Sequence, residues 1–197
     1  MELQAKVESL LAEFPEILAE EPEFRGERTI LLRETGKLAD VCAFAKEKLG
    51  FDYLVDLSSI DYYGDDPRFE LVYELYSYAD GNNLRLKTRV SEESASAPTV
   101  TGVWRTANWH EREVWDMMGV RFDGHPELKR ILMWEGYPYF PLRKDFPVVG
   151  KETELPEVAF TRPAPLEGGP FVTSPGVTGA EAREPRSRGA EEEDFGQ

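Results

Sequence analysis

The side chains most capable of chemistry gather in one short stretch, NWHEREVWDMMG, at residues 108–119. Carboxylates, an arginine and a histidine stand there between two tryptophans. Such a cluster could serve catalysis, metal binding or contact with a partner protein, and all three uses draw on the same side-chain types. The spacing of these residues and the rest of the chain must therefore decide between the three uses. The charged or titratable members are His110, Glu111, Arg112, Glu113 and Asp116.

Metal binding is poorly supported by the spacing. A zinc site on a helix needs a second histidine four residues after the first, and the position four residues after His110 holds Val114. The other histidine of the chain follows the predicted helix. A free-standing metal-dependent enzyme is thus kept as the alternative from another functional class. It would use His110, Glu111, Glu113 and His125.

Catalysis by this chain alone is also poorly supported. A general acid or base among these carboxylates would need a raised pKa, and the neighbouring Arg112 opposes that shift. The sequence contains no serine–glycine elbow, phosphate loop or dinucleotide fingerprint. Its single cysteine, Cys42, excludes a disulfide framework and an iron–sulfur cluster held by four cysteines of this chain. Cys42 is predicted to be a small core residue.

The charged stretch itself predicts a helix over residues 109–118. Asn108 is a good N-cap, and Glu111 stands where a capping box places its acid. Gly119 suits the left-handed position just past a helix end. The interpretation that requires no specific function is therefore a capped surface helix with its apolar face in the core. That face would consist of Val114, Met117 and Met118.

Two further expectations concern the surface of this helix. Arg112 and Asp116 are four residues apart, which predicts an ion pair within the helix. Glu113 is expected to contribute to the cap or to reach a partner. Trp104 and Trp109 are more often core residues than contact residues, judged from the usual burial of tryptophan.

The periodicity of the remaining sequence predicts the elements that position this helix. The order helix, strand, helix and then a meander of three strands predicts an α+β fold, a two-layer sandwich of a mainly antiparallel sheet with helices. Basic residues alternate along the last strand and could face the acidic strand before it or simply face water. The predicted helices cover 3–18, with a kink or a restart at Pro15, and 38–49. The predicted strands cover 28–34, 51–60, 68–78 and 83–91. The basic residues are Arg85, Lys87 and Arg89.

The charge distribution restricts the partners. A formal net charge of −15 makes direct binding to nucleic acid or anionic lipid unfavourable. Residues 100–150 are the balanced part, with seven acidic and seven basic residues. No apolar run approaches the ~18 residues that span a bilayer, and the start of the chain lacks the pattern of a secretion signal. These features predict a cytoplasmic protein that contacts other proteins.

The C-terminal segment differs in composition from the rest. Residues 151–197 contain six prolines and six glycines and show no helical or strand periodicity. Such a segment cannot bury enough apolar surface to fold by itself. We therefore expect a folded domain over 1–150 and an extended C-terminal arm that orders only on a partner. Phe160 and Phe171 are among its candidate anchors.

A resemblance adds to this interpretation. The run EREVWDMMGVRFDGHPELKRIL, followed by PLRKDFP, resembles the signature of the 30-kDa-class subunit family of respiratory complex I, the C-type subunit of bacterial NADH–quinone oxidoreductase. The likeness covers roughly residues 28–147. Phe140 stands directly before PLRKD, where the family often has histidine. The spaced pattern of charged and aromatic residues is long and therefore specific.

The resemblance implies a structural subunit of the hydrophilic arm that binds no cofactor and docks on the 49-kDa-class subunit, the D-type subunit of bacteria. FMN and iron–sulfur clusters would belong to partner subunits, and the whole complex would transfer electrons from NADH to quinone and translocate protons. The chain would be peripheral on the cytoplasmic side of the inner membrane, which it would contact only indirectly. The same family also serves membrane-bound hydrogenase complexes, which is the second alternative. The predicted interface residues are Glu111, Arg112, Glu113, Asp116, His125, Arg130, Arg143, Lys144, Asp145, Phe160 and Phe171.

Overall fold

A five-stranded mixed sheet is the main element of the computed structural model, which describes residues 2–134 and 136–147. Across the sheet the strands follow the order β1 (Leu18–Glu20), β2 (Thr29–Leu32), β5 (Asn83–Val90), β4 (Phe69–Tyr76) and β3 (Tyr53–Asp61). Strands β2 and β5 run parallel, and all other neighbours run antiparallel. The predicted α+β class with a mainly antiparallel sheet is confirmed.

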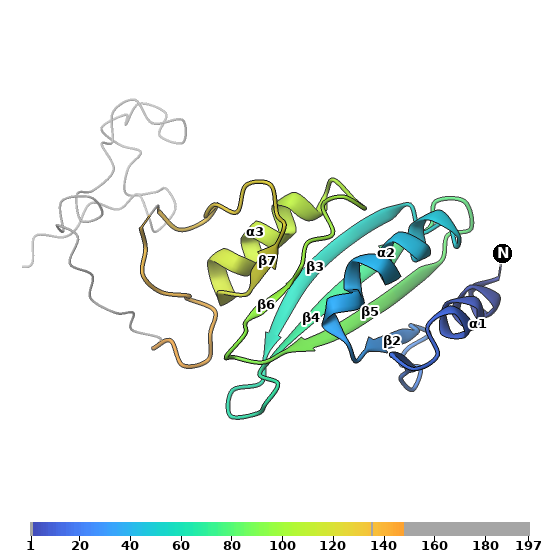
Figure 1. Ribbon diagram of the computed structural model, residues 1–197, viewed down its shortest axis with the longest axis horizontal. Coiled ribbons are helices and arrows are strands. Elements are labelled where there is room, and N and C mark those ends of the chain that lie inside the picture. The colour runs from blue at the N-terminus through green and yellow to red at the C-terminus, as the bar shows by residue number, and fades with distance from the viewer. Residues whose placement is uncertain (1, 135, 148–197) are drawn as a thin grey trace, which may run out of the picture. The chain divides into compact units, whose positions relative to one another are not determined.

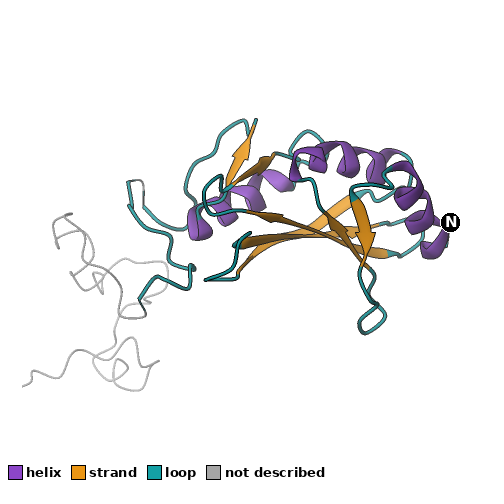
Figure 2. Cartoon of the chain, turned by 60° about the horizontal axis from the view of Figure 1, so that its bottom comes forward, coloured by secondary structure: helices purple, strands orange, loops and turns teal. Residues whose placement is uncertain are grey.

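Helices cover one face of this sheet and enclose the core (Figures 1 and 2). They are α1 (Leu3–Glu13) and α2 (Leu38–Glu47), and the 3₁₀ turn η1 (Thr35–Lys37) precedes α2. The apolar stripe of each helix is buried against the sheet, including Val7, Leu10, Val41 and Cys42. Cys42 is a core residue, as predicted, and burial raises the pKa of its thiol.

The N-terminal helix is shorter than its apolar periodicity predicts. It ends at Glu13, because Pro15 lacks the N–H that a further helical turn needs and its ring clashes with the preceding turn. Leu18, the last residue of the predicted stripe, lies in β1 and pairs with Leu32 of β2. The prediction of helix through residue 18, kinked or restarted at Pro15, was therefore wrong, and β1 was missed.

The charged face of the predicted meander is paired within the sheet. Arg85 on β5 bonds to Glu74 on β4. Lys87 Nζ and Arg89 Nε lie 3.5 and 3.1 Å from the two carboxylate oxygens of the buried Glu70. The basic residues thus face the acidic strand, which was the first of the two alternatives. Opposite charges on neighbouring strands stabilise the register of the sheet.

A second, two-stranded sheet holds the charged helix beside the edge strand β3. It pairs β6 (Ser96–Pro98) in parallel with β7 (Arg121–Asp123). Between them in sequence lies α3 (Ala107–Met118), which packs against β3 (Figure 1). The sequence does not reveal this sheet, since three-residue strands are too short to show alternation.

The predicted C-terminal arm lies outside the described residues. The division near residue 150, and the roles of Phe160 and Phe171 as anchors, therefore stay predictions. Within the described ranges, no helix combines the length and the apolar character that a bilayer crossing requires.

Candidate functional site

Glu111 is a buried carboxylate that ties α3 to the loop after β6. Thr99 donates its hydroxyl to Glu111 Oε2 at 2.5 Å, and the Val100 N–H donates to Oε1 at 2.7 Å. The side chain has no exposed surface. Burial raises its pKa to about 7, and the two hydrogen bonds offset only part of that effect.

The predicted capping box at the start of α3 was wrong. The helix begins at Ala107, with Thr106 in the N-cap position, and no side chain caps it. Asn108 lies inside the first turn, and Glu111 points to the Thr99 loop instead of back to the cap. The end of the helix is as predicted: Gly119 adopts the left-handed conformation, with φ at +77°.

His125 fixes the turn after β7 beside this carboxylate. Its Nδ1 accepts the Glu127 N–H at 3.0 Å, and its Nε2 lies 3.3 Å from the Asn108 carbonyl oxygen, to which it donates. Burial lowers the pKa of the imidazole. The ring is therefore neutral, with its hydrogen on Nε2, and Nε2 lies 3.9 Å from Glu111.

The structure does not gather the four residues of the metal-enzyme alternative. His110 Nδ1 lies 3.4 Å from Asp56, and Glu113 is exposed on another face of α3. Among residues 2–134 and 136–147, no three His, Cys, Asp or Glu side chains are placed to share a metal ion. Only Glu111 and His125 are neighbours.

The free energy of unfolding of the wild type should fall as the pH rises, and we expect Glu111→Gln to abolish this pH dependence. The folded pKa of Glu111, about 7, exceeds the ordinary 4.5. The unfolded chain therefore loses this proton first, and stability declines between those two pH values by roughly 3 kcal/mol. Glutamine does not titrate and can still accept from Val100 and donate to Thr99. Urea unfolding of both proteins from pH 4.5 to 8 measures the difference, and parallel stability curves would contradict it.

Asp116 is a second buried carboxylate, and it organises the segment after β7. Its Oδ2 accepts three consecutive backbone N–H groups, from Ile131 at 3.0 Å, Leu132 at 2.7 Å and Met133 at 3.0 Å. Its Oδ1 lies 2.5 Å from Arg130 Nη1. Burial alone would raise the pKa of Asp116, but these hydrogen bonds outweigh it and lower the pKa.

The predicted ion pair between Arg112 and Asp116 was therefore wrong. Asp116 turns inward to Arg130, while Arg112 donates its Nε to the Lys129 carbonyl at 3.0 Å. Arg112 also lies over the Trp109 ring, 4.9 Å from its centroid, and Trp109 is 63% exposed. Trp104, in contrast, is buried and donates its indole N–H to a backbone carbonyl.

Arg130 continues the Asp116 anchor into the next turn of chain. Its Nη2 donates to the carbonyl oxygens of Tyr137 and Tyr139 at 2.6 and 3.3 Å. Its guanidinium carbon lies 5.3 Å from the ring centroids of both Trp115 and Phe140. One arginine thus holds the aromatic segment against α3 by hydrogen bonds and by cation–π contacts.

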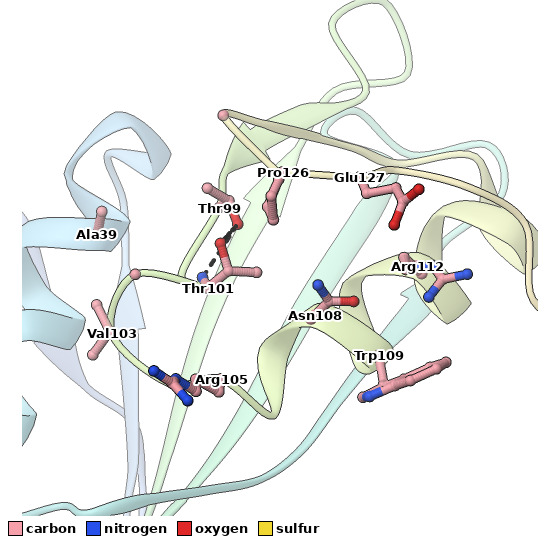
Figure 3. A pocket seen from close by; sticks show the side chains of 12 residues that line it. Ala39, Thr99, Thr101, Val103, Arg105, Asn108, Trp109, Arg112, Pro126 and Glu127 are labelled. Carbon is pink, nitrogen blue, oxygen red and sulfur yellow. Dashed lines mark hydrogen bonds between the residues drawn. The ribbon is translucent and has the colours of Figure 1, made fainter.

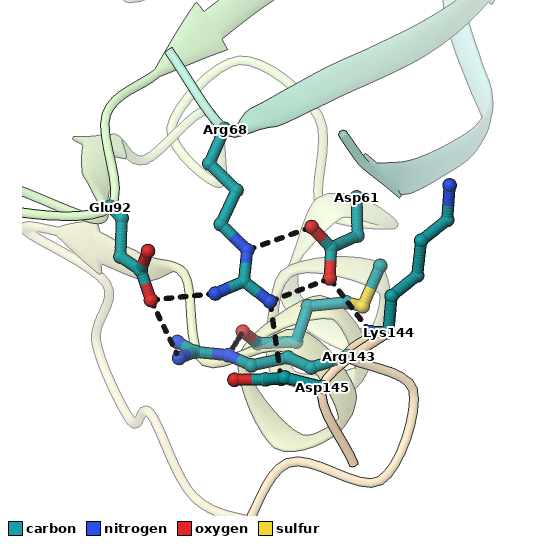
Figure 4. Close-up of polar contacts among 7 residues, drawn as sticks. Asp61, Arg68, Glu92, Arg143, Lys144 and Asp145 are labelled. Atoms are coloured by element: carbon teal, nitrogen blue, oxygen red, sulfur yellow. Dashed lines mark hydrogen bonds and ion pairs between the residues drawn. The ribbon is translucent and has the colours of Figure 1, made fainter. Parts of the chain in front are cut away.

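A third carboxylate anchors the PLRKD motif to the main sheet (Figure 4). Asp61, at the end of β3, binds Arg68 in a bidentate manner with two distances of 2.8 Å. It also accepts the Lys144 N–H at 2.8 Å, while Arg68 reaches Asp145 at 3.1 Å and Glu92 at 2.6 Å. The hydrogen bonds from Arg68 lower the pKa of Asp61. Asp61 and Arg68 are each no more than 3% exposed.

The roles of Asp61 and Arg68 were not predicted: Asp61 lies one residue beyond the predicted strand 51–60, and Arg68 opens the predicted strand 68–78. The available signal was a pair of opposite charges flanking a predicted turn between two strands. The predicted interface residues separate into two groups. Buried or nearly buried side chains belong to Glu111, Asp116, His125 and Arg130; partly exposed or exposed ones belong to Arg112, Glu113, Arg143, Lys144 and Asp145.

Gly119 lets the PLRKD segment approach the end of α3. A Cβ at this position would lie 2.6 Å from Arg143 Nη2 and from the Phe140 ring. We expect Gly119→Ala to cost about 1–2 kcal/mol for the left-handed backbone and a further ~1–3 kcal/mol for the displaced side chains. Gly26→Ala is the matched control, because its φ is +81° and its Cβ would meet nothing within 4 Å. If urea unfolding showed equal losses of stability in Gly119→Ala and Gly26→Ala, the close approach of Arg143 and Phe140 to residue 119 would be unimportant for stability.

The fold and the site together define an α+β domain in which three buried carboxylates each fix a separate loop. The family described as "Respiratory-chain NADH dehydrogenase, 30 Kd subunit" matches residues 32–152. The chain belongs to this family of complex I subunits, as its resemblance predicted.

Individual relatives agree with this assignment. The C 2 subunit of NADH-quinone oxidoreductase from Rhizobium meliloti is 50% identical over 133 residues, which cover 66% of this chain and 72% of the relative. The C-type subunit of NADH-quinone oxidoreductase from Geotalea uraniireducens is 44% identical over 145 residues, with coverages of 74% and 88%.

Solved structures share the fold. One described as Nqo5, trypsin-resistant fragment (1-134), is 34% identical with a TM-score of 0.54 and covers 65% of this chain and all of its own. A chain of the membrane-bound sulfane sulfur reductase, an archaeal respiratory membrane complex, has a TM-score of 0.64 at 24% identity; the match covers 74% of this chain and 86% of that one.

Proposed function

We propose that this chain is a structural subunit of the hydrophilic arm of a proton-translocating NADH–quinone oxidoreductase. The observation that carries the proposal is that the buried carboxylates bind groups of the same chain. Asp61, Glu111 and Asp116 each accept hydrogen bonds from neighbouring segments of this chain. In this proposal the chain binds no cofactor, and FMN and iron–sulfur clusters in partner subunits carry electrons from NADH to quinone.

The anchored loops supply a surface for docking on the 49-kDa-class (D-type) subunit. Leu132 and Leu142 are each 61% exposed, although the Leu132 N–H donates to Asp116 and the Leu142 N–H donates to the Met117 carbonyl oxygen. Large apolar side chains that are exposed on a fixed backbone lose little conformational freedom on binding, which favours them as contact residues. The complex would place the chain peripherally on the cytoplasmic side of the inner membrane.

Purification of the tagged full chain from its native membranes tests this function. We expect the 49-kDa-class subunit and an NADH-oxidising flavoprotein to co-purify, and we expect deletion of the gene to abolish NADH–quinone reductase activity. Recovery of the chain alone, with activity intact in the deletion strain, would refute the proposal.

The equivalent subunit of a membrane-bound hydrogenase or related complex is a second candidate. The fold shared with the chain from the sulfane sulfur reductase favours it, although at 24% identity that likeness concerns the fold alone. The same purification separates the two candidates, because a hydrogenase-type complex would lack the NADH-oxidising flavoprotein.

Glu113 offers a test at the level of one residue. Its carboxylate is exposed on α3 and has no partner among the side chains that the structure describes. We expect Glu113→Ala to lower the amount of assembled complex and to leave the thermal stability of the isolated chain unchanged. Glu47→Ala, an exposed carboxylate on α2, is the matched control. Lost stability with normal assembly would argue against a contact at Glu113.

A further inference from the structure

A groove runs between the start of α3, the loop after β6 and the turn after β7 (Figure 3). Its volume is about 840 Å³. Thr99, which donates its hydroxyl to the buried Glu111, is one of the residues that line it. The residues that matter for its chemistry are Thr101, Arg105, Asn108, Trp109, Arg112 and Glu127. We call this the Arg105–Arg112 groove.

Neither arginine of this groove lies within 4 Å of a carboxylate of the described residues, although Arg112 helps to lower the pKa of Glu127 electrostatically. Arg105 is exposed, and its side chain makes no ion pair or hydrogen bond with the described residues. Arg112 uses only its Nε, toward a carbonyl oxygen, so both terminal nitrogens are available. The indole of Trp109 lies beneath its guanidinium and holds that plane in place. An arginine held in this way is suited to bidentate binding of a carboxylate.

The protein has a net charge of −15, so carboxylates that could pair with an arginine are abundant in it. The acidic residue lining the groove, Glu127, is engaged with Lys129 at 2.6 Å. Of the nine other described arginines, six lie within 4 Å of a carboxylate of the same chain, namely Arg28, Arg68, Arg85, Arg89, Arg130 and Arg143. The remaining three are Arg25, Arg33 and Arg121.

Asn108 adds a group that can pair with a peptide backbone. Its side chain projects from α3 into the groove (Figure 3) and has no hydrogen-bond partner among the residues that the structure describes. A primary amide carries both donors and an acceptor, as a peptide unit does. Trp109, largely exposed beside it, supplies an apolar and aromatic surface of the kind that is enriched in protein interfaces.

We propose that the Arg105–Arg112 groove binds an extended segment of a partner subunit that carries an aspartate or glutamate side chain. The carboxylate would pair with Arg112 or Arg105, and Asn108 would hydrogen-bond to the backbone of the segment. This inference rests on the proposed function, since it assumes that the chain works inside a complex, and it adds the chemistry of one contact.

Site-directed crosslinking in the assembled complex tests this contact. Gly102 lines the groove, and a Cβ there would meet nothing within 4 Å. Because Cys42 is buried, Gly102→Cys gives one accessible thiol in the chain for a benzophenone maleimide. We expect light to join residue 102 to another subunit, within a few residues of an aspartate or glutamate. Glu23→Cys, exposed after β1 at the opposite edge of the main sheet, is the control for labelling position.

Charge variants in the Gly102→Cys background complete the test. We expect Arg105→Ala with Arg112→Ala to reduce the crosslink, or the assembly on which it depends, by roughly tenfold. Arg33→Ala, an exposed arginine beyond β2, should change neither. A crosslink only within this chain, a joined segment without acidic residues, or full crosslinking in the double variant would overturn the inference. If the complex co-purifies in those cases, the proposed function stands; if no complex co-purifies at all, the proposed function itself fails.

Discussion

Asp116→Ala is expected to lower the free energy of unfolding of the chain by about 3–5 kcal/mol, because it breaks a buried ion pair and leaves several donors without an acceptor. Asp116 is fully buried, and Arg130 loses its carboxylate partner when the side chain is truncated. Three backbone N–H groups lose the same acceptor. Urea unfolding of the purified chain measures the total loss.

The Asp116 variant should also release its loop locally. The Arg130 guanidinium lies against the Asp116 carboxylate and the Trp115 ring, and the next N–H, of Ile131, donates to the same carboxylate. Trypsin should therefore cleave after Arg130 faster in Asp116→Ala than in the wild type. Glu113→Ala, three residues earlier on the same helix but exposed, is the control and should leave both measurements unchanged. A loss below about 1 kcal/mol with normal trypsin resistance would show that the loop holds its conformation without the carboxylate.

The sequence predicted the elements that depend on local periodicity. The meander of β3, β4 and β5 and the helix α2 follow from alternation and from apolar spacing, which act between near neighbours. The two-layer arrangement then follows because each apolar face needs a partner. What was missed depends on distant pairing: β6 and β7 have three residues each and meet across more than twenty intervening residues.

The roles of the charged residues were harder to predict for a related reason. On α3, Arg112 stands four residues before Asp116 and offers a surface ion pair that is worth only a few tenths of a kcal/mol. The alternative partners of Asp116 are N–H groups 15 to 17 residues later in the sequence, in a segment with no periodicity. Unsatisfied backbone N–H groups would destabilise the protein by more than an Arg112–Asp116 surface pair would stabilise it. The Asp116 side chain is therefore oriented inward. Only the tertiary structure reveals that competition.

Asp61→Ala is expected to destabilise the protein by about 3 kcal/mol, near the lower end of the range for broken buried ion pairs. Arg68 would lose a bidentate partner and keep the more exposed Glu92 and Asp145, which limits the loss. The Lys144 N–H would lose its acceptor as well, so the PLRKD segment should loosen.

Two further measurements separate a buried-charge effect from simple loss of packing. The double variant Asp61→Leu with Arg68→Met should recover at least half of the lost stability, because it removes the unpaired charge and fills the space with apolar groups.

In the wild type, the lowered pKa of Asp61 contributes stability that is complete above the ordinary carboxyl pKa and disappears as the pH falls through the lowered value. The gap between wild type and Asp61→Ala should therefore narrow on acidification below about pH 4. A gap that stays constant down to pH 2, or a double variant less stable than Asp61→Ala, would show that the ion pair does not anchor the PLRKD segment.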